Sequence, residues 1–174
     1  NRGSVREVSD YYATPQNVIS DALRKFFELE YIDSVKDVLD PCAGGNIENE
    51  THHYTDMPYV KVLQEEYGMN PDTMDVREDS LADVKMDFLK ASPDIYKERY
   101  DLVITNPPFA IAEEVIRHSL EFCRNGKFVI MLLRLNFLEG LKRKDLFDNY
   151  MPKYIFVHRK RIDFTRNLKT GKHG

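Results

Sequence analysis

Two rhythms of apolar and polar residues alternate along this chain. Behind Thr14 and Pro15, apolar side chains recur every three or four positions as far as Phe27, which predicts a helix with one buried face. Thr14 suits the N-cap of that helix and Pro15 suits its first turn. The same spacing predicts further helices at residues 59–67, 111–124 and 141–150.

Short apolar runs between turn residues form the second rhythm and predict strands. Residues 127–133 (KFVIMLL) are almost continuously apolar, as expected for a strand that is buried on both faces. The other predicted strands lie at 35–39, 73–77, 84–88, 101–106 and 154–158. Because strands alternate with helices, we expect an α/β fold with a doubly wound, mainly parallel, Rossmann-like sheet.

The length of 174 residues is enough for one domain with a substantial core. We therefore predict a single domain over residues 1–174, with a flexible start at 1–10 and a mobile loop at 46–57. No apolar run is long enough to cross a bilayer, so no membrane contact is expected. The two cysteines, Cys42 and Cys123, form no C-x-x-C pair, which suggests a reducing, cytoplasmic setting.

The net charge of −4 is unevenly distributed along the chain. Residues 1–123 carry 12 lysines and arginines against 25 acids, whereas residues 124–174 carry 13 against 4. Such asymmetry is typical of a protein with one side facing a polyanion, although a solvated basic tail explains it equally well. The candidate phosphate contacts in this basic stretch are Arg134, Lys142, Arg143 and Arg161.

Unusual residues occur where predicted strands end, which is where parallel sheets bind ligands. The first such stretch is Asp40-Pro41-Cys42-Ala43-Gly44-Gly45, in which the glycines allow a tight turn and close approach of a ligand. It is neither G-x-G-x-x-G nor a phosphate loop, which favours a compact ligand such as S-adenosylmethionine over a pyrophosphate-bearing nucleotide. Asp40 can accept hydrogen bonds from an ammonium group, directly or through water. A plain strand-to-loop turn is the alternative.

Acids lie within or at the end of the next two predicted strands, at the same edge of the sheet. Asp75 lies about one βα unit after the glycines, where an acid can bind ribose hydroxyls, and it is favoured over the nearby Glu78 and Asp79 because it lies within the apolar frame of the strand. Asp87 and Phe88 end the following strand and can contact an adenine amino group and a ring face. Each acid taken singly is more often a solvated surface charge.

The four residues Asn106-Pro107-Pro108-Phe109 end the most apolar central strand, because proline cannot donate to a sheet ladder. An exocyclic amine of a nucleobase is a poor nucleophile, since its lone pair is delocalised into the ring. The Asn106 side-chain oxygen and the rigidly held Pro107 carbonyl would accept both amino hydrogens and turn the lone pair toward a methyl donor. Phe109 would stack on the base. A bare strand-ending turn requires neither the amide nor the aromatic ring.

Three motifs in this order resemble the S-adenosylmethionine-dependent adenine-N6 DNA methyltransferases. The family signature Asn/Asp-Pro-Pro-Tyr/Phe is matched by residues 106–109, and the first cofactor motif by residues 40–45, with adjacent glycines in place of spaced ones. The aromatic-x-Thr-Pro element of the family is matched by YATP at 12–15. The segments LLRLNFLEG and RKRIDFT are similar to phage-type and bacterial relatives.

The resemblance implies a doubly wound methyltransferase fold and site-specific methylation of DNA, of the restriction–modification kind. It implies that S-adenosylmethionine is the cofactor and is bound by Tyr12, Thr14, Pro15, Asp40, Pro41, Cys42, Ala43, Gly44, Asp75, Asp87 and Phe88. It also implies catalytic roles for Asn106, Pro107, Pro108 and Phe109. A target adenine inside a duplex would have to be flipped out to reach this site.

The chain departs from the family in its extent. Only 60 residues separate Gly45 from Asn106, so we expect no separate DNA-recognition domain, and recognition by a partner subunit or domain becomes an alternative. The last strand of the sheet is also expected to be missing. We predict no metal site, because Cys42, His52 and His53 lack the spacing of zinc ligands.

Two alternatives to DNA methylation stay open from the sequence. Methyltransferases with a related signature act on RNA or on protein glutamine amides, where a conjugated nitrogen poses the same chemical problem. The second alternative is a catalytically idle subunit that binds nucleic acid or a partner.

Overall fold

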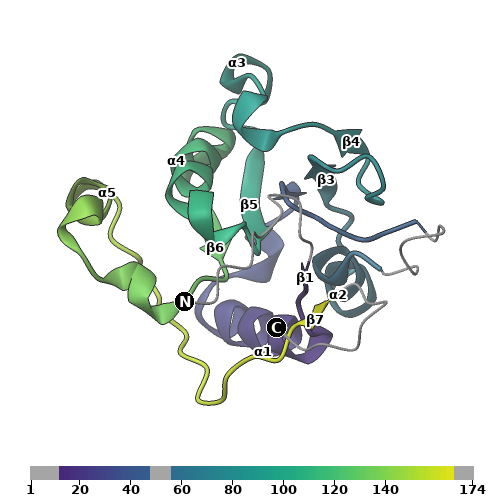
Figure 1. The fold of residues 1–174 in the computed structure, drawn as a ribbon, viewed down its shortest axis with the longest axis horizontal. Coiled ribbons are helices and arrows are strands. Elements are labelled where there is room, and N and C mark those ends of the chain that lie inside the picture. Colours follow the sequence, from purple (N-terminus) through teal and green to yellow (C-terminus); the bar gives the residue numbers. More distant parts are fainter. Residues whose placement is uncertain (1–11, 48–55, 167–174) are drawn as a thin grey trace, which may run out of the picture.

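The structure is a computed structural model that describes residues 12–47 and 56–166. Its centre is a five-stranded parallel sheet with strand order β4-β3-β2-β5-β6 (Figure 1). The strands are β2 (Val38–Asp40), β3 (Asp72–Asp75), β4 (Val84–Lys85), β5 (Tyr100–Thr105) and β6 (Cys123–Met131). The order reverses direction at β2, so the predicted α/β, doubly wound, Rossmann-like architecture is confirmed.

Helices cover both faces of this sheet. The α-helices are α1 (Gln16–Leu29), α2 (Pro58–Tyr67), α3 (Pro93–Tyr96), α4 (Ala112–Phe122) and α5 (Lys144–Asn149). Short 3-10 turns are η1 (Ile32–Ser34), η2 (Phe88–Lys90), η3 (Phe109–Ile111), η4 (Leu135–Leu138) and η5 (Leu141–Arg143). A separate antiparallel pair joins β1 (Tyr12–Ala13) to β7 (Thr165–Arg166). Within 12–47 and 56–166, no helix has the length and apolar character needed to cross a membrane.

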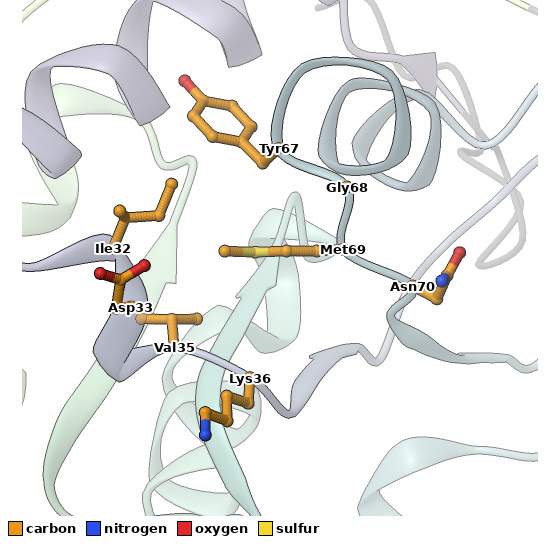
Figure 2. A pocket seen from close by; sticks show the side chains of 8 residues that line it. All are labelled: Ile32, Asp33, Val35, Lys36, Tyr67, Gly68, Met69 and Asn70. Carbon is orange, nitrogen blue, oxygen red and sulfur yellow. The ribbon is translucent and has the colours of Figure 1, made fainter.

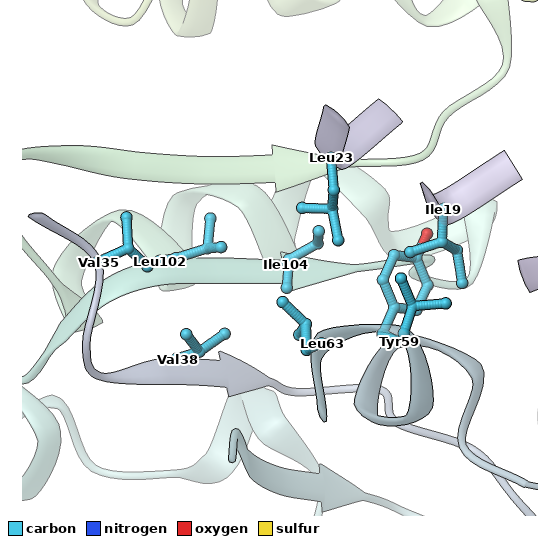
Figure 3. Packing of buried hydrophobic residues seen from close by; sticks show 9 residues of the cluster. Ile19, Leu23, Val35, Val38, Tyr59, Leu63, Leu102 and Ile104 are labelled. Carbon is cyan, nitrogen blue, oxygen red and sulfur yellow. The ribbon is translucent and has the colours of Figure 1, made fainter. Parts of the chain in front are cut away.

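Each face of the sheet has its own hydrophobic core. On one face, α1 and α2 bury Ile19, Leu23 and Leu63 against strand residues, and Figure 3 shows these side chains converging. Alternate strand positions serve opposite faces, so Leu102 and Ile104 enter this core whereas Val103 enters the other. The second core packs α4, η2 and part of α3 on the sheet. Burial on both faces explains the continuous apolar runs of the strands.

Some predicted element boundaries are wrong. The helix predicted to reach residue 124 ends at Phe122, and β6 begins immediately at Cys123 instead of residue 127. Gly126, at φ +76°, therefore lies inside the strand, where a register shift marks the pairing of β5 with β6. Glycine tolerates this conformation, which accommodates the irregular pairing inside β6.

The strand predicted at 154–158 is also wrong. This segment has no regular secondary structure and pairs with no described strand, and Ile155 and Val157 are more than half exposed. Lys153 and the Tyr154 hydroxyl instead bind Glu30 at the end of α1. Polar side chains therefore fix the segment on the surface, in place of a backbone ladder.

Two predicted mobile segments lie largely outside the described residues: the start at 1–10, and 48–55 of the loop at 46–57. At the beginning of that loop, Asn46 is fully buried and its Oδ1 accepts a hydrogen bond from Arg77 over 2.6 Å. The backbone N–H of Ile47 donates to the Asp79 carbonyl over 3.0 Å. The loop is thus anchored where it leaves the sheet.

The carboxylate of Asp101 links β5 to the segment before β2 and to β6 through hydrogen bonds and an ion pair. It accepts hydrogen bonds from the backbone N–H groups of Lys36 (3.0 Å) and Asp37 (3.2 Å), which precede β2. It also pairs with Arg124 of β6 at 2.9 Å. Burial alone would raise the pKa of Asp101, but these two N–H groups and the Arg124 guanidinium outweigh burial and lower it.

We expect Asp101→Asn to reduce the free energy of unfolding by about 1–3 kcal/mol near neutral pH, because the amide keeps one acceptor oxygen and loses the charge that pairs with Arg124. Since folding lowers this pKa, the contribution is present above the unfolded pKa, about 3.9, and is lost as the pH falls below it. Urea denaturation at neutral and acidic pH checks both points. Asp94→Asn, at an exposed position on α3, is the matched control. A difference that persists undiminished in acid would contradict the prediction.

Candidate active site

Three predicted motifs end at the same edge of the sheet. Asp40 is the last residue of β2, Asp75 is the last of β3, and Asn106 directly follows β5. These strands are parallel neighbours, so their carboxyl ends lie together. The rule that places ligands at this edge therefore applies to the residues that the sequence singled out.

Asn106 is held by the segment at the start of the described chain. Its Nδ2 donates a hydrogen bond to Oγ1 of Thr14 over 3.2 Å, across 92 positions of sequence. Thr14 is only 3% exposed and stands between β1 and α1. The prediction that Thr14 caps α1 is wrong, because Pro15 is the N-cap and the Thr14 hydroxyl accepts from Asn106 instead. The Asn106 Oδ1 atom is buried and finds no hydrogen-bond partner among the described residues. One side of the amide is thus fixed by the fold, whereas its acceptor oxygen is buried and unpaired within the described chain.

Behind Asn106 the chain turns sharply into α4. Pro107 is buried, Pro108 is exposed and caps η3, and the Pro108 carbonyl accepts the Ile111 N–H over 3.1 Å. Phe109 is half-buried, and the guanidinium carbon of Arg134 lies 4.8 Å from its ring centroid. The two prolines restrict the backbone here, so that the Asn106 amide and the Phe109 ring are held on a stiff turn.

Asp40 is a fully buried carboxyl with one oxygen unused. Its Oδ1 accepts the Cys42 N–H over 3.2 Å, whereas Oδ2 has no hydrogen-bond partner within the described chain. Burial raises the pKa of Asp40 to about 7, against the opposing effect of the nearby Thr105 hydroxyl and the Cys42 N–H. The Thr105 hydroxyl favours the charged form but stays outside normal hydrogen-bond geometry. A cation beside Oδ2 would stabilise the charged carboxylate.

Cys42, next to Asp40, is a poor candidate for a nucleophile. Burial, followed by the nearby charges of Asp40 and Asp75, raises the pKa of the Cys42 thiol. The thiol therefore stays neutral, and only a thiolate attacks readily. Its side chain is small enough to line a ligand site without taking part in the chemistry.

Two successive glycines shape the loop after β2. Gly44 and Gly45 have φ of +71° and +69°, a region that residues with a Cβ rarely adopt. A Cβ on Gly45 would lie 2.9 Å from Cγ of Met57, so the loop packs closely under the start of α2. The Ala43 N–H donates to the Met74 carbonyl over 2.9 Å, which fastens the turn to β3.

Asp75 serves this loop in the structure. Its Oδ2 accepts the Gly44 N–H over 2.9 Å, and its Oδ1 accepts the Arg77 N–H over 2.9 Å. The Arg77 side chain pairs with the same carboxylate at 3.2 Å and donates to the Gly45 carbonyl over 2.7 Å. Both carboxylate oxygens therefore already accept hydrogen bonds within the fold, and Oδ2, which accepts one, keeps capacity for the expected ribose contact.

Arg77 is a site residue that sequence reasoning missed. Besides Asp75 and Gly45, it reaches Oδ1 of Asn46 and Asp79, and thus ties the glycine loop to the segment after β3. Its position two residues after the predicted acid is the one available signal, because a cation there can fold back on the carboxylate.

Asp87 and Phe88 do not end a strand as predicted, because β4 stops at Lys85 and both residues belong to the start of η2. They also differ in how accessible they are. The Phe88 ring is 4% exposed and packs against His118 and Phe122, so its faces belong to the core. The Asp87 side chain is 36% exposed, and its Oδ1 caps η2 by accepting the Leu89 N–H over 3.1 Å. Of this predicted pair, only Asp87 retains an exposed polar group for an adenine contact.

The remaining predicted cofactor residues are close to Thr14 or to Asp40 in the sequence. Tyr12 belongs to β1, Pro15 is the N-cap of α1, and Pro41 and Ala43 are buried in the loop after β2. None of the described His, Cys, Asp or Glu side chains form a cluster of three able to hold a metal ion. His52 and His53 lie outside the described residues.

The four predicted phosphate contacts are not equivalent. Arg134, Lys142 and Arg161 are exposed. Arg143 is half-buried, with its guanidinium 4.2 Å from the Phe137 ring centroid and 3.9 Å from Glu113. Arg143 is thus engaged within the fold, whereas the other three keep their charge at the surface.

A cavity of about 500 Å³ lies at the opposite edge of the sheet (Figure 2). It is lined by Ile32, Asp33, Val35, Lys36, Tyr67, Gly68, Met69 and Asn70. These residues precede β2 and β3, and none of them belongs to the predicted motifs. The cavity is therefore separate from the candidate active site.

The candidate active site thus combines a buried acid, a glycine turn and an amide with an available oxygen, contributed by β2, β5 and the segment before α1. Comparisons with known proteins found no family model, no curated protein and no solved structure that matches this chain.

Proposed function

We propose that this protein transfers a methyl group from S-adenosylmethionine to the exocyclic amino group of adenine in DNA. The observation that carries the proposal is the divided role of the Asn106 amide. Its nitrogen is held by Thr14, whereas its oxygen has no partner among the described residues. An unpaired acceptor can take a hydrogen bond from the exocyclic amine, whose nitrogen must lose its planarity before it attacks the methyl group.

The chemistry asks little of the protein beyond positioning. Asn106 Oδ1 and the Pro107 carbonyl each accept a hydrogen bond from one of the two N–H groups of the amine. These hydrogen bonds direct the nitrogen lone pair away from the ring and toward the methyl donor. Phe109 provides the stacking face that holds the base. The stiff proline turn limits reorganisation during transfer, so most of the rate enhancement comes from orientation.

The residues present fit the methionine end of the cofactor. The buried Oδ2 of Asp40, which has no hydrogen-bond partner among the described residues, suits its ammonium group, and the left-handed turn at Gly44 follows it at the strand end. Asp87 remains the candidate for the adenine amino group. When bound, S-adenosylmethionine supplies an electrophilic methyl group on a sulfonium centre.

The order of the YATP, DPCAGG and NPPF motifs supports DNA adenine over RNA or a protein amide as the acceptor. The target base would be flipped out of a duplex to meet Phe109. A separate subunit or domain that acts with this one is the candidate for sequence recognition.

Titration calorimetry with S-adenosylmethionine, followed by tritiated methyl transfer to unmethylated DNA, tests the proposal. We expect binding and recovery of the label as N6-methyladenine. Binding without transfer to any DNA would redirect the search to RNA or glutamine acceptors. No binding would contradict the proposal and favour an idle subunit.

A further inference from the structure

The contact between Arg134 and Phe109 adds a feature to the proposed site. The guanidinium carbon lies 4.8 Å from the ring centroid, within the range of a favourable cation–π contact. Arg134 is exposed, and the structure records no ion pair for it among the described residues. A cation whose contact is an aromatic face keeps its hydrogen-bond donors for another partner.

Residues on both sides of Arg134 in the chain hold its backbone near the NPPF turn. β6 carries the chain past the end of β5, where the Leu132 N–H donates to the Thr105 carbonyl over 3.1 Å. Directly after Arg134, η4 buries Phe137 against Ala112 of α4, three residues beyond Phe109. The backbone that bears Arg134 is therefore fastened to both elements that bear the NPPF turn.

The return segment is fastened a second time through α5. Leu146 is 1% exposed in the same small core as Ala112 and Phe137. Arg117 of α4 pairs with Asp145 of α5 at 3.0 Å and with Glu113 at 3.0 Å. These contacts fix the segment that follows Arg134 against α4, close to the NPPF turn.

We infer that Arg134 makes the site selective for a base carried on a phosphodiester chain. The inference rests on the proposed function, since it assumes that the target base stacks on Phe109. The guanidinium covers one face of the Phe109 ring at 4.8 Å, so the base would stack on the opposite face, with its centroid about 4.5–7 Å from that of the ring. The phosphates flanking such a base then come within reach of an arginine fork, which binds phosphate in a bidentate manner.

This role separates the possible acceptors by their chemistry. A nucleic acid presents a phosphate on either side of the target base, whereas a glutamine side chain and a free nucleoside present none. Arg134 acts as a positioning residue, because it holds the chain next to the base and does not touch the amino nitrogen. DNA and RNA share the phosphate, so this contact does not distinguish them.

The test compares wild type with Arg134→Gln and Arg134→Lys on a short oligo(dA) and on free adenosine. With S-adenosylhomocysteine present, we expect Arg134→Gln to bind oligo(dA) about tenfold more weakly, since a charge-assisted contact is lost. The slope of log Kd against log salt should become shallower by about one. Arg134→Lys should retain the slope, and Lys25→Gln, an exposed site on α1, should match wild type.

Methyl transfer supplies the second readout. The kcat/KM for oligo(dA) should fall about tenfold in Arg134→Gln, whereas the value for adenosine stays unchanged. Equal losses on both acceptors would reduce Arg134 to a support for Phe109, and unchanged oligo(dA) binding would also overturn the inference. Faster transfer to a glutamine peptide than to oligo(dA) would do the same. If wild type binds oligo(dA) but methylates nothing, the proposed function fails while the salt slope still decides the role of Arg134.

Discussion

Asn106→Ala is expected to lower the rate of methyl transfer by about 10²–10³-fold, the usual effect of removing one preorganised group that stabilises a transition state. The substitution deletes the available acceptor and leaves the adjacent prolines in place. The affinity for S-adenosylmethionine should change little, because the proposed cofactor contacts lie on other segments. Single-turnover transfer to DNA and titration calorimetry measure the two effects separately.

Two neighbouring variants sharpen that result. Asn106→Asp keeps two acceptor oxygens and should retain much more activity than Asn106→Ala. Thr14→Val removes the oxygen that accepts the Asn106 Nδ2 hydrogen and frees the amide to rotate, so we expect a loss of about tenfold in kcat. Transfer by Asn106→Ala at a rate near that of wild type would exclude Asn106 as the group that activates the amine.

The parts of the fold that the sequence predicts are those governed by local physics and two-sided burial. The helical spacing behind Pro15 corresponds to α1, and Gly68 ends α2 in the left-handed conformation expected of a C-cap. The end of β5 at Thr105 follows from the prolines, which cannot extend a ladder. Each of these outcomes depends on residues close together in the chain.

The wrong predictions concern structure that depends on contacts between segments distant in the chain. Alternation at 154–158 suggests a strand, yet Tyr154 and Phe156 stack with ring centroids 6.1 Å apart along a surface segment. An extended chain on a surface produces the same period of two as a strand, and only a partner in space distinguishes them.

The candidate site shows the same division. The strand-end rule brings Asp40, Asp75 and Asn106 to one edge, and the structure has them there. It does not reveal that Arg77 folds back to occupy the Asp75 carboxylate, because that depends on the meeting of two loops. Burial of the Phe88 ring likewise depends on packing by α4, 34 positions away at Phe122.

The second large effect concerns the pH dependence of cofactor affinity. Because burial raises the pKa of Asp40 to about 7, the carboxyl is largely protonated in mildly acidic solution. Binding an ammonium beside Oδ2 requires the charged form, so binding releases a proton below this pKa. We expect the association constant to rise roughly tenfold between about pH 5.5 and pH 7.

Above about pH 8 the affinity should fall again, because the α-amino group of the cofactor loses its proton. Calorimetric titrations in buffers of different ionisation enthalpy measure the proton released at each pH. Asp40→Asn should bind weakly throughout and lose the rise on the acidic side. A wild-type association constant that is flat from pH 5.5 to 7 would show that Asp40 does not hold the ammonium.

Stability without cofactor should move in the opposite direction. A carboxyl whose pKa is raised by folding holds its proton more tightly in the folded state. The free energy of unfolding therefore falls as the pH rises from about 4, the unfolded pKa, to about 7. Asp40→Asn removes the buried charge, so it should exceed wild type by about 2–4 kcal/mol at pH 8 and match it near pH 4. Urea denaturation at both pH values decides this, with Asp94→Asn as the control. A gain at pH 8 together with lost cofactor affinity would identify Asp40 as a residue that trades stability for binding.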